Sequence, residues 1–232
     1  MGAPAHPISS REMETRQRQS GFTLVEIAIV LVIIGLLVGG ILKGQELIGS
    51  ARVKRLANDF RVIPTYLSAY QDKFKALPGD DVDVTTHVTA ATLATTPAGS
   101  QGNGVIDGNW NSTTVTDESF LFWGHVRLAN LAPGPAGETD PGYIPTNAAG
   151  GRLGISSAPA VRLQISGMRG TYQVCSAGIA GKLAKQLDTQ MDDGNTAAGW
   201  LRAVPDNSAL GTAAVATGAI DDAANYTVCM TF

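Results

Sequence analysis

The sequence predicts an α+β protein with one long N-terminal helix, a small antiparallel β-sheet, one or two short further helices and long loops. Three observations support this fold class. An apolar run from Phe22 to Leu42 continues as an amphipathic pattern to about Lys75, which indicates a single helix. Glycine, proline and small polar residues dominate the middle of the chain. Alternating apolar residues, typical of strands, fall in its C-terminal third.

The apolar run is long enough to cross a membrane. It holds twenty-one residues from Phe22 to Leu42, and Glu26 is the only ionisable one. About twenty apolar residues at ~1.5 Å each span the ~30 Å hydrocarbon core of a bilayer. A carboxylate there costs roughly 2.5–3.5 kcal/mol at the helix centre and less near an end. A cut between Gly21 and Phe22 would create an α-amine whose positive charge can offset Glu26.

The residues Gly21, Phe22 and Glu26 at these spacings resemble the processing site of the type IV pilin superfamily, which includes the pseudopilins of type II secretion. The resemblance is close over residues 21–42 and loose afterwards. It implies cleavage after Gly21 by a prepilin peptidase and N-methylation of Phe22. It also implies that Glu26 pairs with the Phe22 amine of a neighbouring subunit and so fixes the register of assembly.

Two simpler interpretations compete with this resemblance. A secretory signal peptide cut near Gly49-Ser50-Ala51 would have an apolar region of about 7–15 residues, which is shorter than this run. A plain transmembrane anchor explains the length of the run but not Glu26.

The resemblance divides the chain into four segments. We expect residues 1–21 to be a cytoplasmic leader that is removed, with Met1 or Met13 as its start. The next three are a transmembrane part of the helix at 22–42, an amphipathic upper part at 43–77, and a periplasmic or extracellular head at 78–232.

Within the head, the pattern predicts an end of the long helix at Leu77-Pro78-Gly79, followed by a surface loop at Asp80–Thr116. A second helix capped by Thr116 or Asp117 is expected to run to Leu131, and the residues Ala132–Ala160 read as loop. The remaining expected elements are strands at Val161–Ile165, Tyr172–Val174 and Tyr226–Met230, and a helix at Ala177–Met191. A long helix, loops and then a small sheet is the order expected of a pilin fold.

Two cysteines, Cys175 and Cys229, fall on predicted strands. An exported head lies in an oxidising compartment, where an even number of cysteines favours a disulfide. Type IV pilins often carry a C-terminal disulfide of this kind, so the resemblance supports the same pairing. Two buried thiols are the alternative.

We expect no catalytic activity. The three histidines are His6, His87 and His125, and His6 lies in the leader. The sequence contains no nucleophile elbow, no metal-spaced His/Glu pair and no phosphate-binding loop. An aromatic content of 6% suits a loop-rich head of small residues better than a dense enzyme core.

No cofactor is expected either. The segment Gln101–Trp110 fails the EF-hand template, because placing Asn103 at position one puts Val105 at position three. By resemblance some pseudopilin heads bind Ca²⁺, and Asp192 and Asp193 are the residues that could do so here. A turn after a helix is the simpler interpretation of these two residues.

The charge pattern argues against a nucleic-acid partner. The residues Arg152, Arg162 and Arg169 form a sparse basic group. From Asp72 onward, however, fifteen acidic residues stand against nine basic ones. No aromatic platform accompanies the arginines, so we expect them to be solvated.

These observations, with the resemblance, predict a structural subunit of a filament assembled at the inner membrane: a major or minor pilin, or a pseudopilin. The expected partners are other pilins or pseudopilins in a homo- or hetero-oligomeric filament, the prepilin peptidase, the assembly platform and the inner membrane. The subunit would cross that membrane once with its head outside, and would later lie in a periplasmic or cell-surface filament. The alternative is a membrane-tethered periplasmic binding or adhesion domain that does not polymerise.

Overall fold

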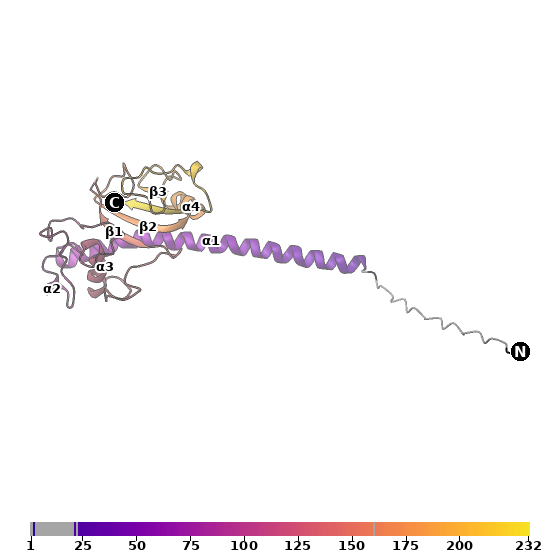
Figure 1. The fold of residues 1–232 in the computed structure, drawn as a ribbon, viewed down its shortest axis with the longest axis horizontal. Coiled ribbons are helices and arrows are strands. Elements are labelled where there is room, and N and C mark those ends of the chain that lie inside the picture. Colours follow the sequence, from indigo (N-terminus) through magenta and orange to yellow (C-terminus); the bar gives the residue numbers. More distant parts are fainter. Residues whose placement is uncertain (1, 3–20, 22, 160) are drawn as a thin grey trace. The chain divides into compact units, whose positions relative to one another are not determined.

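The computed structural model describes residues 2, 21, 23–159 and 161–232. Two compact units divide the chain, Met1–Glu46 and Leu47–Phe232, and the boundary between them lies within the first helix. The predicted α+β class is confirmed, with the long helix first and the sheet towards the C-terminus (Figure 1). The elements are α1 (Leu24–Phe74), α2 (Val84–His87), α3 (Glu118–Leu128), β1 (Leu153–Ser157), β2 (Tyr172–Ala180), α4 (Gly181–Met191), β3 (Leu201–Pro205), a 3₁₀ turn (Thr217–Ala219) and β4 (Asn225–Thr231).

Helix α1 changes character along its length. Up to Leu42 it is apolar on every side, and every one of its described large apolar side chains there is about half exposed or more. Beyond Leu47 only one face is buried, at the helical spacing that an amphipathic helix requires. That face comprises Val53, Leu56, Ala57, Phe60, Ile63, Leu67 and Tyr70.

The C-terminal end of α1 lies where the sequence predicts it. Lys75 follows the helix with φ of +58°, and Gly79 has φ of +96°. The backbone N–H of Gly79 donates a hydrogen bond to His125 in α3. A Cβ at Gly79 would lie 2.4 Å from the carbonyl oxygen of Glu118, so only glycine allows this approach of the two segments.

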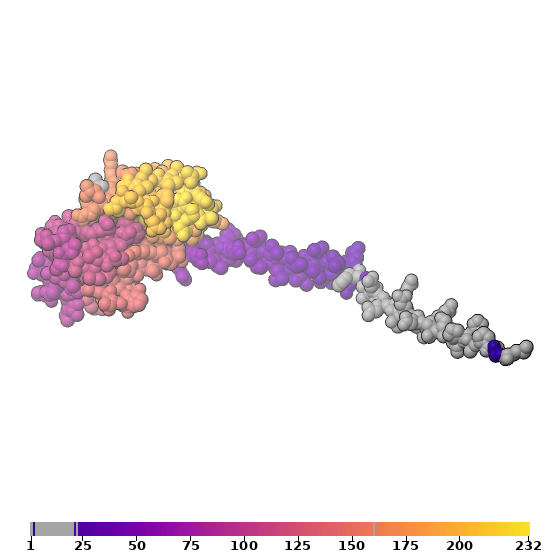
Figure 2. Space-filling model, in the orientation of Figure 1, coloured from indigo at the N-terminus to yellow at the C-terminus, as the bar shows by residue number. Residues whose placement is uncertain are grey.

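The sheet has four antiparallel strands in the order β1-β2-β4-β3, and it lies beside the upper part of α1 (Figure 1). In its register Val174 opposes Met230, and Cys175 opposes Cys229. The C-terminal strand β4 is therefore central, paired on both sides. The space-filling view shows the middle and C-terminal parts of the chain packed into one body (Figure 2).

Each face of the sheet contributes to a separate apolar core. One face, with Val174, Val228 and Met230, packs in the main core together with the buried face of α1 and with α3 and α4. The other face carries the two cysteines and is covered by loop residues, among them Trp110 and Ile165. Because both faces are covered, β1 and β4 are buried at almost every position.

The strand predicted at Val161–Ile165 is wrong. This segment starts with a turn at residues 161–162, and its Val161 side chain is 81% exposed. The Gln173 side chain accepts from the N–H of Gln164 and donates to the carbonyl of Arg162, and the only ladder contact among the described residues is an isolated bridge between Ile165 and Thr212. The alternation of apolar residues there marks contact with the second core at Leu163 and Ile165, not a strand.

Two strands were not predicted. Strand β1 (Leu153–Ser157) falls in the expected loop Ala132–Ala160, because its glycine and serines are poor strand formers. Gly154 is required there, since a Cβ would lie 1.9 Å from the carbonyl oxygen of Trp110. Strand β3 (Leu201–Pro205) is an edge strand that ends in proline, as the edge position allows.

The segment Asp80–Thr116 is not simply a surface loop. It contains α2 and the fully buried side chains of Val84 and Ile106. Helix α3 ends at Leu128 instead of Leu131, and α4 begins at Gly181 because residues up to Ala180 belong to β2. Asp117 precedes α3, but its carboxylate accepts from the Ser112 hydroxyl instead of capping the helix.

We predict that Phe60→Ala destabilises the head by about 3–5 kcal/mol, because Phe60 is fully buried on α1 and its loss leaves a cavity. Leu47→Ala in the same helix is the matched control, since Leu47 is 61% exposed and its truncation should change stability by no more than about 0.5 kcal/mol. Denaturant unfolding of the detergent-solubilised chain measures both. Equal effects of the two substitutions would contradict the proposed core face of α1.

Candidate functional site

The first turn of α1 contains a reciprocal set of hydrogen bonds between Thr23 and Glu26. The backbone N–H and the hydroxyl of Thr23 both donate to Glu26 Oε2, at 2.8 and 2.9 Å. The backbone N–H of Glu26 is 3.2 Å from the Thr23 hydroxyl oxygen, which accepts from it. This arrangement is a capping box, in which the residue before the helix and the third helical residue satisfy each other's backbone donors. It places the carboxylate at the positive end of the helix dipole.

The surface of α1 that follows this turn is apolar over its whole circumference. Its most apolar 18-residue window has a mean hydropathy of 2.9, and no part of that window is buried. Among the described residues, α1 is the one helix long and apolar enough to cross a membrane. In water such a surface would be strongly unfavourable, so lipid or other helices must cover it.

The residues predicted for processing are only partly described. Gly21, two residues before Thr23 of the capping box, is exposed. Phe22 and the leader residues up to 20 lie outside the described residues. Thr23 was not singled out from the sequence, although a threonine three residues before a glutamate at the start of an apolar run is the sequence signature of a capping box.

A disulfide joins Cys175 in β2 to Cys229 in β4. The two residues are direct cross-strand partners and are fully buried in the second core. The bridge spans 54 residues of sequence, which include α4 and β3. Closing a loop of this length in the unfolded chain corresponds to about 4 kcal/mol in the chain-entropy model.

The described histidines hold segments of the head together. His125 is 1% exposed; its Nδ1 accepts from the N–H of Gly79, and its Nε2 lies 2.8 Å from the carbonyl of Thr92. These partners place the proton on Nε2, and burial lowers the pKa of the ring. His87 binds Asp81 at 2.8 Å and stacks on Phe74. Both rings are thus occupied by contacts within the head.

A pocket of about 580 Å³ lies at the C-terminal end of α1, with Asp80 and Asp81 in its wall. Asp80 accepts three backbone N–H groups, those of residues 102, 103 and 104. Asp81 accepts from the hydroxyl of Tyr70 and also binds His87. Asp80 and Asp81 are therefore used in holding the loop to the helix.

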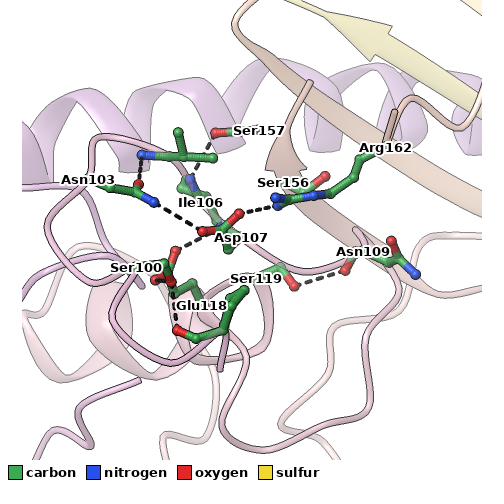
Figure 3. A network of polar contacts seen from close by, with 12 residues as sticks. Ser100, Asn103, Ile106, Asp107, Asn109, Glu118, Ser119, Ser156, Ser157 and Arg162 are labelled. Atoms are coloured by element: carbon green, nitrogen blue, oxygen red, sulfur yellow. Dashed lines mark hydrogen bonds and ion pairs between the residues drawn. The ribbon is translucent and has the colours of Figure 1, made fainter. Parts of the chain in front are cut away.

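A buried polar network connects the loop before α3 to the sheet (Figure 3). Glu118 is fully buried and accepts from the N–H of Asp107 at 2.7 Å and from the hydroxyl of Ser100 at 3.2 Å. Asp107 in turn accepts from the Asn103 amide and forms an ion pair with Arg162. Burial, with smaller contributions from the charges of Asp80 and Asp107, raises the pKa of Glu118 to about 7. One carboxyl of this network therefore titrates near neutral pH.

A second group of acids lies where α4 ends. Asp188, Asp192 and Asp193 each direct one carboxylate oxygen to within 4.8 Å of the others. Asp188 is fully buried, whereas Asp193 is exposed. Burial, together with the charges of Asp192 and Asp193, raises the pKa of Asp188 to about 6. The sequence had indicated Asp192 and Asp193 but not Asp188.

Comparison with known proteins identifies the N-terminal segment. Residues 16–42 match the prokaryotic N-terminal methylation motif, which is the leader signature of type IV pilins and pseudopilins. The match contains the capping box and the start of the exposed apolar surface. It indicates a pilin-like structural subunit anchored in a membrane. Neither a curated protein nor a solved structure matches the chain.

We predict that the head loses stability as the pH rises from about 4.5 to 7, and that Glu118→Gln removes much of this loss. The pKa of Glu118 in the folded head lies above its ordinary value of 4.5, so the folded state holds this proton to a higher pH than the unfolded state. Its contribution to stability is therefore complete below about pH 4.5 and is lost as the pH approaches 7. The loss is on the order of 2–3 kcal/mol.

Unfolding at pH 5 and pH 8 measures this prediction. Glutamine can accept from the Asp107 N–H and donate to Ser100, so the variant keeps the network while remaining neutral. The partly buried Glu138→Gln serves as the control. The same pH dependence in wild type and in Glu118→Gln would show that Glu118 does not titrate in this range.

Proposed function

We propose that this chain is a structural subunit of an inner-membrane-assembled filament, either a major or minor type IV pilin or a pseudopilin of type II secretion. The observation that carries the proposal is the methylation motif at residues 16–42, whose residues from Leu24 onward belong to a helix with an apolar surface exposed on every side. A helix of this kind suits two successive environments, lipid before assembly and the packed helices of other subunits afterwards.

In this proposal, cleavage after Gly21 removes the leader and leaves Phe22 as the methylated N-terminal residue. The leader lies in the cytoplasm, the residues 22–42 cross the inner membrane, and the head at 78–232 lies outside it. The amphipathic residues 43–77 join the two. The prepilin peptidase, the assembly platform and other pilins or pseudopilins are the partners that this pathway requires, and none of its steps needs a cofactor in the head.

The capping box gives Glu26 a partner in the free subunit. Such a cap contributes about 0.5–2 kcal/mol. A carboxylate and an amine 4 Å apart attract by about 4 kcal/mol at an effective dielectric of 20. If a neighbouring subunit brings its Phe22 amine to Glu26, the charge pair therefore outweighs the cap, and Glu26 sets the register of assembly.

The first prediction concerns processing. Gly21→Ala should be cleaved poorly or not at all, because the peptidase is expected to need a residue without a Cβ before the scissile bond. Intact-mass analysis of the membrane fraction separates the mature chain, which begins at methylated Phe22, from the uncleaved precursor. A wild-type chain that begins elsewhere would overturn the proposed function.

The second prediction separates the charge of Glu26 from its capping role. Glu26→Gln can keep the capping box, since glutamine also serves at this position, but it removes the charge. We expect normal membrane insertion and at least a roughly tenfold loss of filament incorporation. Thr23→Val, which removes the capping hydroxyl and keeps the charge, is the matched control and should still assemble.

Sheared surface and periplasmic fractions, compared with and without the assembly ATPase, measure incorporation. Normal incorporation of Glu26→Gln would show that register is set elsewhere. A wild-type distribution that does not depend on the ATPase would favour the membrane-tethered binding or adhesion domain that does not polymerise.

A further inference from the structure

A cavity of about 150 Å³ lies beside the second core, on the face of the sheet that does not pack on α1. Trp110 and Ala177, which belong to that core or pack against it, form its apolar wall. The rest of the wall is polar, and it contains one cationic side chain, Arg152, and one anionic side chain, Asp206. The volume corresponds to about five water molecules at ~30 Å³ each, so the cavity suits a molecule of about five or six non-hydrogen atoms.

Arg152 is partly buried, contrary to the expectation from the sequence that it is solvated. Its Nη2 donates to the carbonyl oxygen of Ser112, which is the only hydrogen bond of this guanidinium group among the described residues. Its Nε is buried without an acceptor, and no carboxylate in residues 23–159 and 161–232 forms an ion pair with it. A guanidinium group has five N–H donors in a fixed fork. Most of these donors therefore remain for a planar anion, and a carboxylate is the anion whose geometry they match.

Asp206 uses one carboxylate oxygen within the protein. Its Oδ1 accepts from the hydroxyl of Thr227 at 2.6 Å and from the backbone N–H of Gly178 at 3.3 Å. Its Oδ2 makes no hydrogen bond within the described chain. The bonds of Oδ1 hold the carboxylate in the cavity wall, so Oδ2 is available to a proton donor in the cavity.

The neutral polar groups of the wall hold one another in place. Trp110 Nε1 donates to Gln164 Oε1 at 2.9 Å, and Gln164 Nε2 donates to the carbonyl oxygen of Ser208 at 3.0 Å. The hydroxyl of Ser208 donates to the carbonyl oxygen of Pro205, which closes the turn that carries Asp206. Because these groups are already ordered, little conformational entropy remains to be lost when a ligand binds.

The two charged side chains of the wall select the charge of the ligand. Arg152 and Asp206 line the same cavity but do not form an ion pair with each other. A simple anion bound to the guanidinium group would face the carboxylate of Asp206, and a simple cation bound to that carboxylate would face the guanidinium group. A zwitterion carries both charges and can compensate both side chains at once.

We propose that this cavity binds a small free α-amino acid, of the size of glycine or alanine. The guanidinium group of Arg152 donates to the carboxylate of the amino acid, and Oδ2 of Asp206 accepts from its ammonium group. The volume between Trp110 and the turn at residues 206–208 excludes larger side chains. The site lies wholly in the head and does not depend on filament assembly, so a tethered domain that does not polymerise would retain it.

The test is calorimetric titration of the detergent-solubilised full chain with glycine and with L-alanine, which should each bind at one site per chain. Acetate and methylamine carry only one of the two charges and should bind at least about tenfold more weakly. L-leucine should not bind, because it exceeds the volume of the cavity. No binding of glycine or L-alanine at concentrations on the order of 10 mM, or acetate binding as tight as that of glycine, would overturn the proposal.

Asp206→Asn separates binding from folding. Its side-chain oxygen can still accept from Thr227 and Gly178, so the variant should unfold at a Tm close to that of wild type. It should lose at least about tenfold in affinity for glycine without losing affinity for acetate, because the removed charge faces only the ammonium group. Arg152→Gln should weaken the binding of both, and Arg202→Gln, on β3 outside the cavity wall, is the control that should change neither. Wild-type affinity for glycine in Asp206→Asn would contradict the proposal even if Arg152→Gln does not fold.

Discussion

The burial of one face of α1 beyond Leu47 is the interaction on which the rest of the head depends. The sheet, α3 and α4 all contribute to the main core that includes this face, and the loop between α1 and α3 is anchored to it through Tyr70 and Asp81. An apolar sheet face must be buried against another element, and α1 covers the face with Val174, Val228 and Met230. The same continuous helix, from Leu24 onward, therefore contains part of the methylation motif and completes the core of the head.

The head contains several buried acids, and each is compensated differently. Asp80 accepts three backbone N–H groups, and Asp107 pairs with Arg162. Glu118 has hydrogen bonds but no cation, and its pKa rises to about 7. Asp188 has neither hydrogen bonds nor a cation in the described chain. Within this series of four acids, the two with the least compensation are Glu118 and Asp188, and burial raises their pKa values to about 7 and about 6.

The sequence predicted those features that depend on local pattern. The length and end of α1 follow from apolar periodicity and from Pro78-Gly79, and β2 and β4 follow from alternation. Strand β1 was missed because glycine and serine have low strand propensity. Gly154 allows the strand to approach the backbone of Trp110, and the Ser157 hydroxyl accepts a hydrogen bond from the N–H of Ile106. Val161–Ile165 was misread because its backbone is bound by the Gln173 side chain and by the loop at residues 211–212, not by a neighbouring strand. Asp188 could not be singled out from the sequence, because two aspartates four residues apart on a helix are common. Only the packing shows that Asp188 is buried without a hydrogen-bond partner among the described residues.

The capping box gives the Glu26 carboxylate hydrogen-bond partners within its own chain. An unpaired carboxylate would oppose insertion of the apolar helix, yet Thr23 and the first turn already hold it at the end where negative charge is favoured. Under the proposed function, these hydrogen bonds lower the cost of Glu26 in the free subunit, and the stronger charge pair would form only when a neighbouring subunit brings its N-terminal amine. In that proposal the internal partner reduces the cost of an isolated charge before assembly, and the larger energy of the external charge pair would select the register.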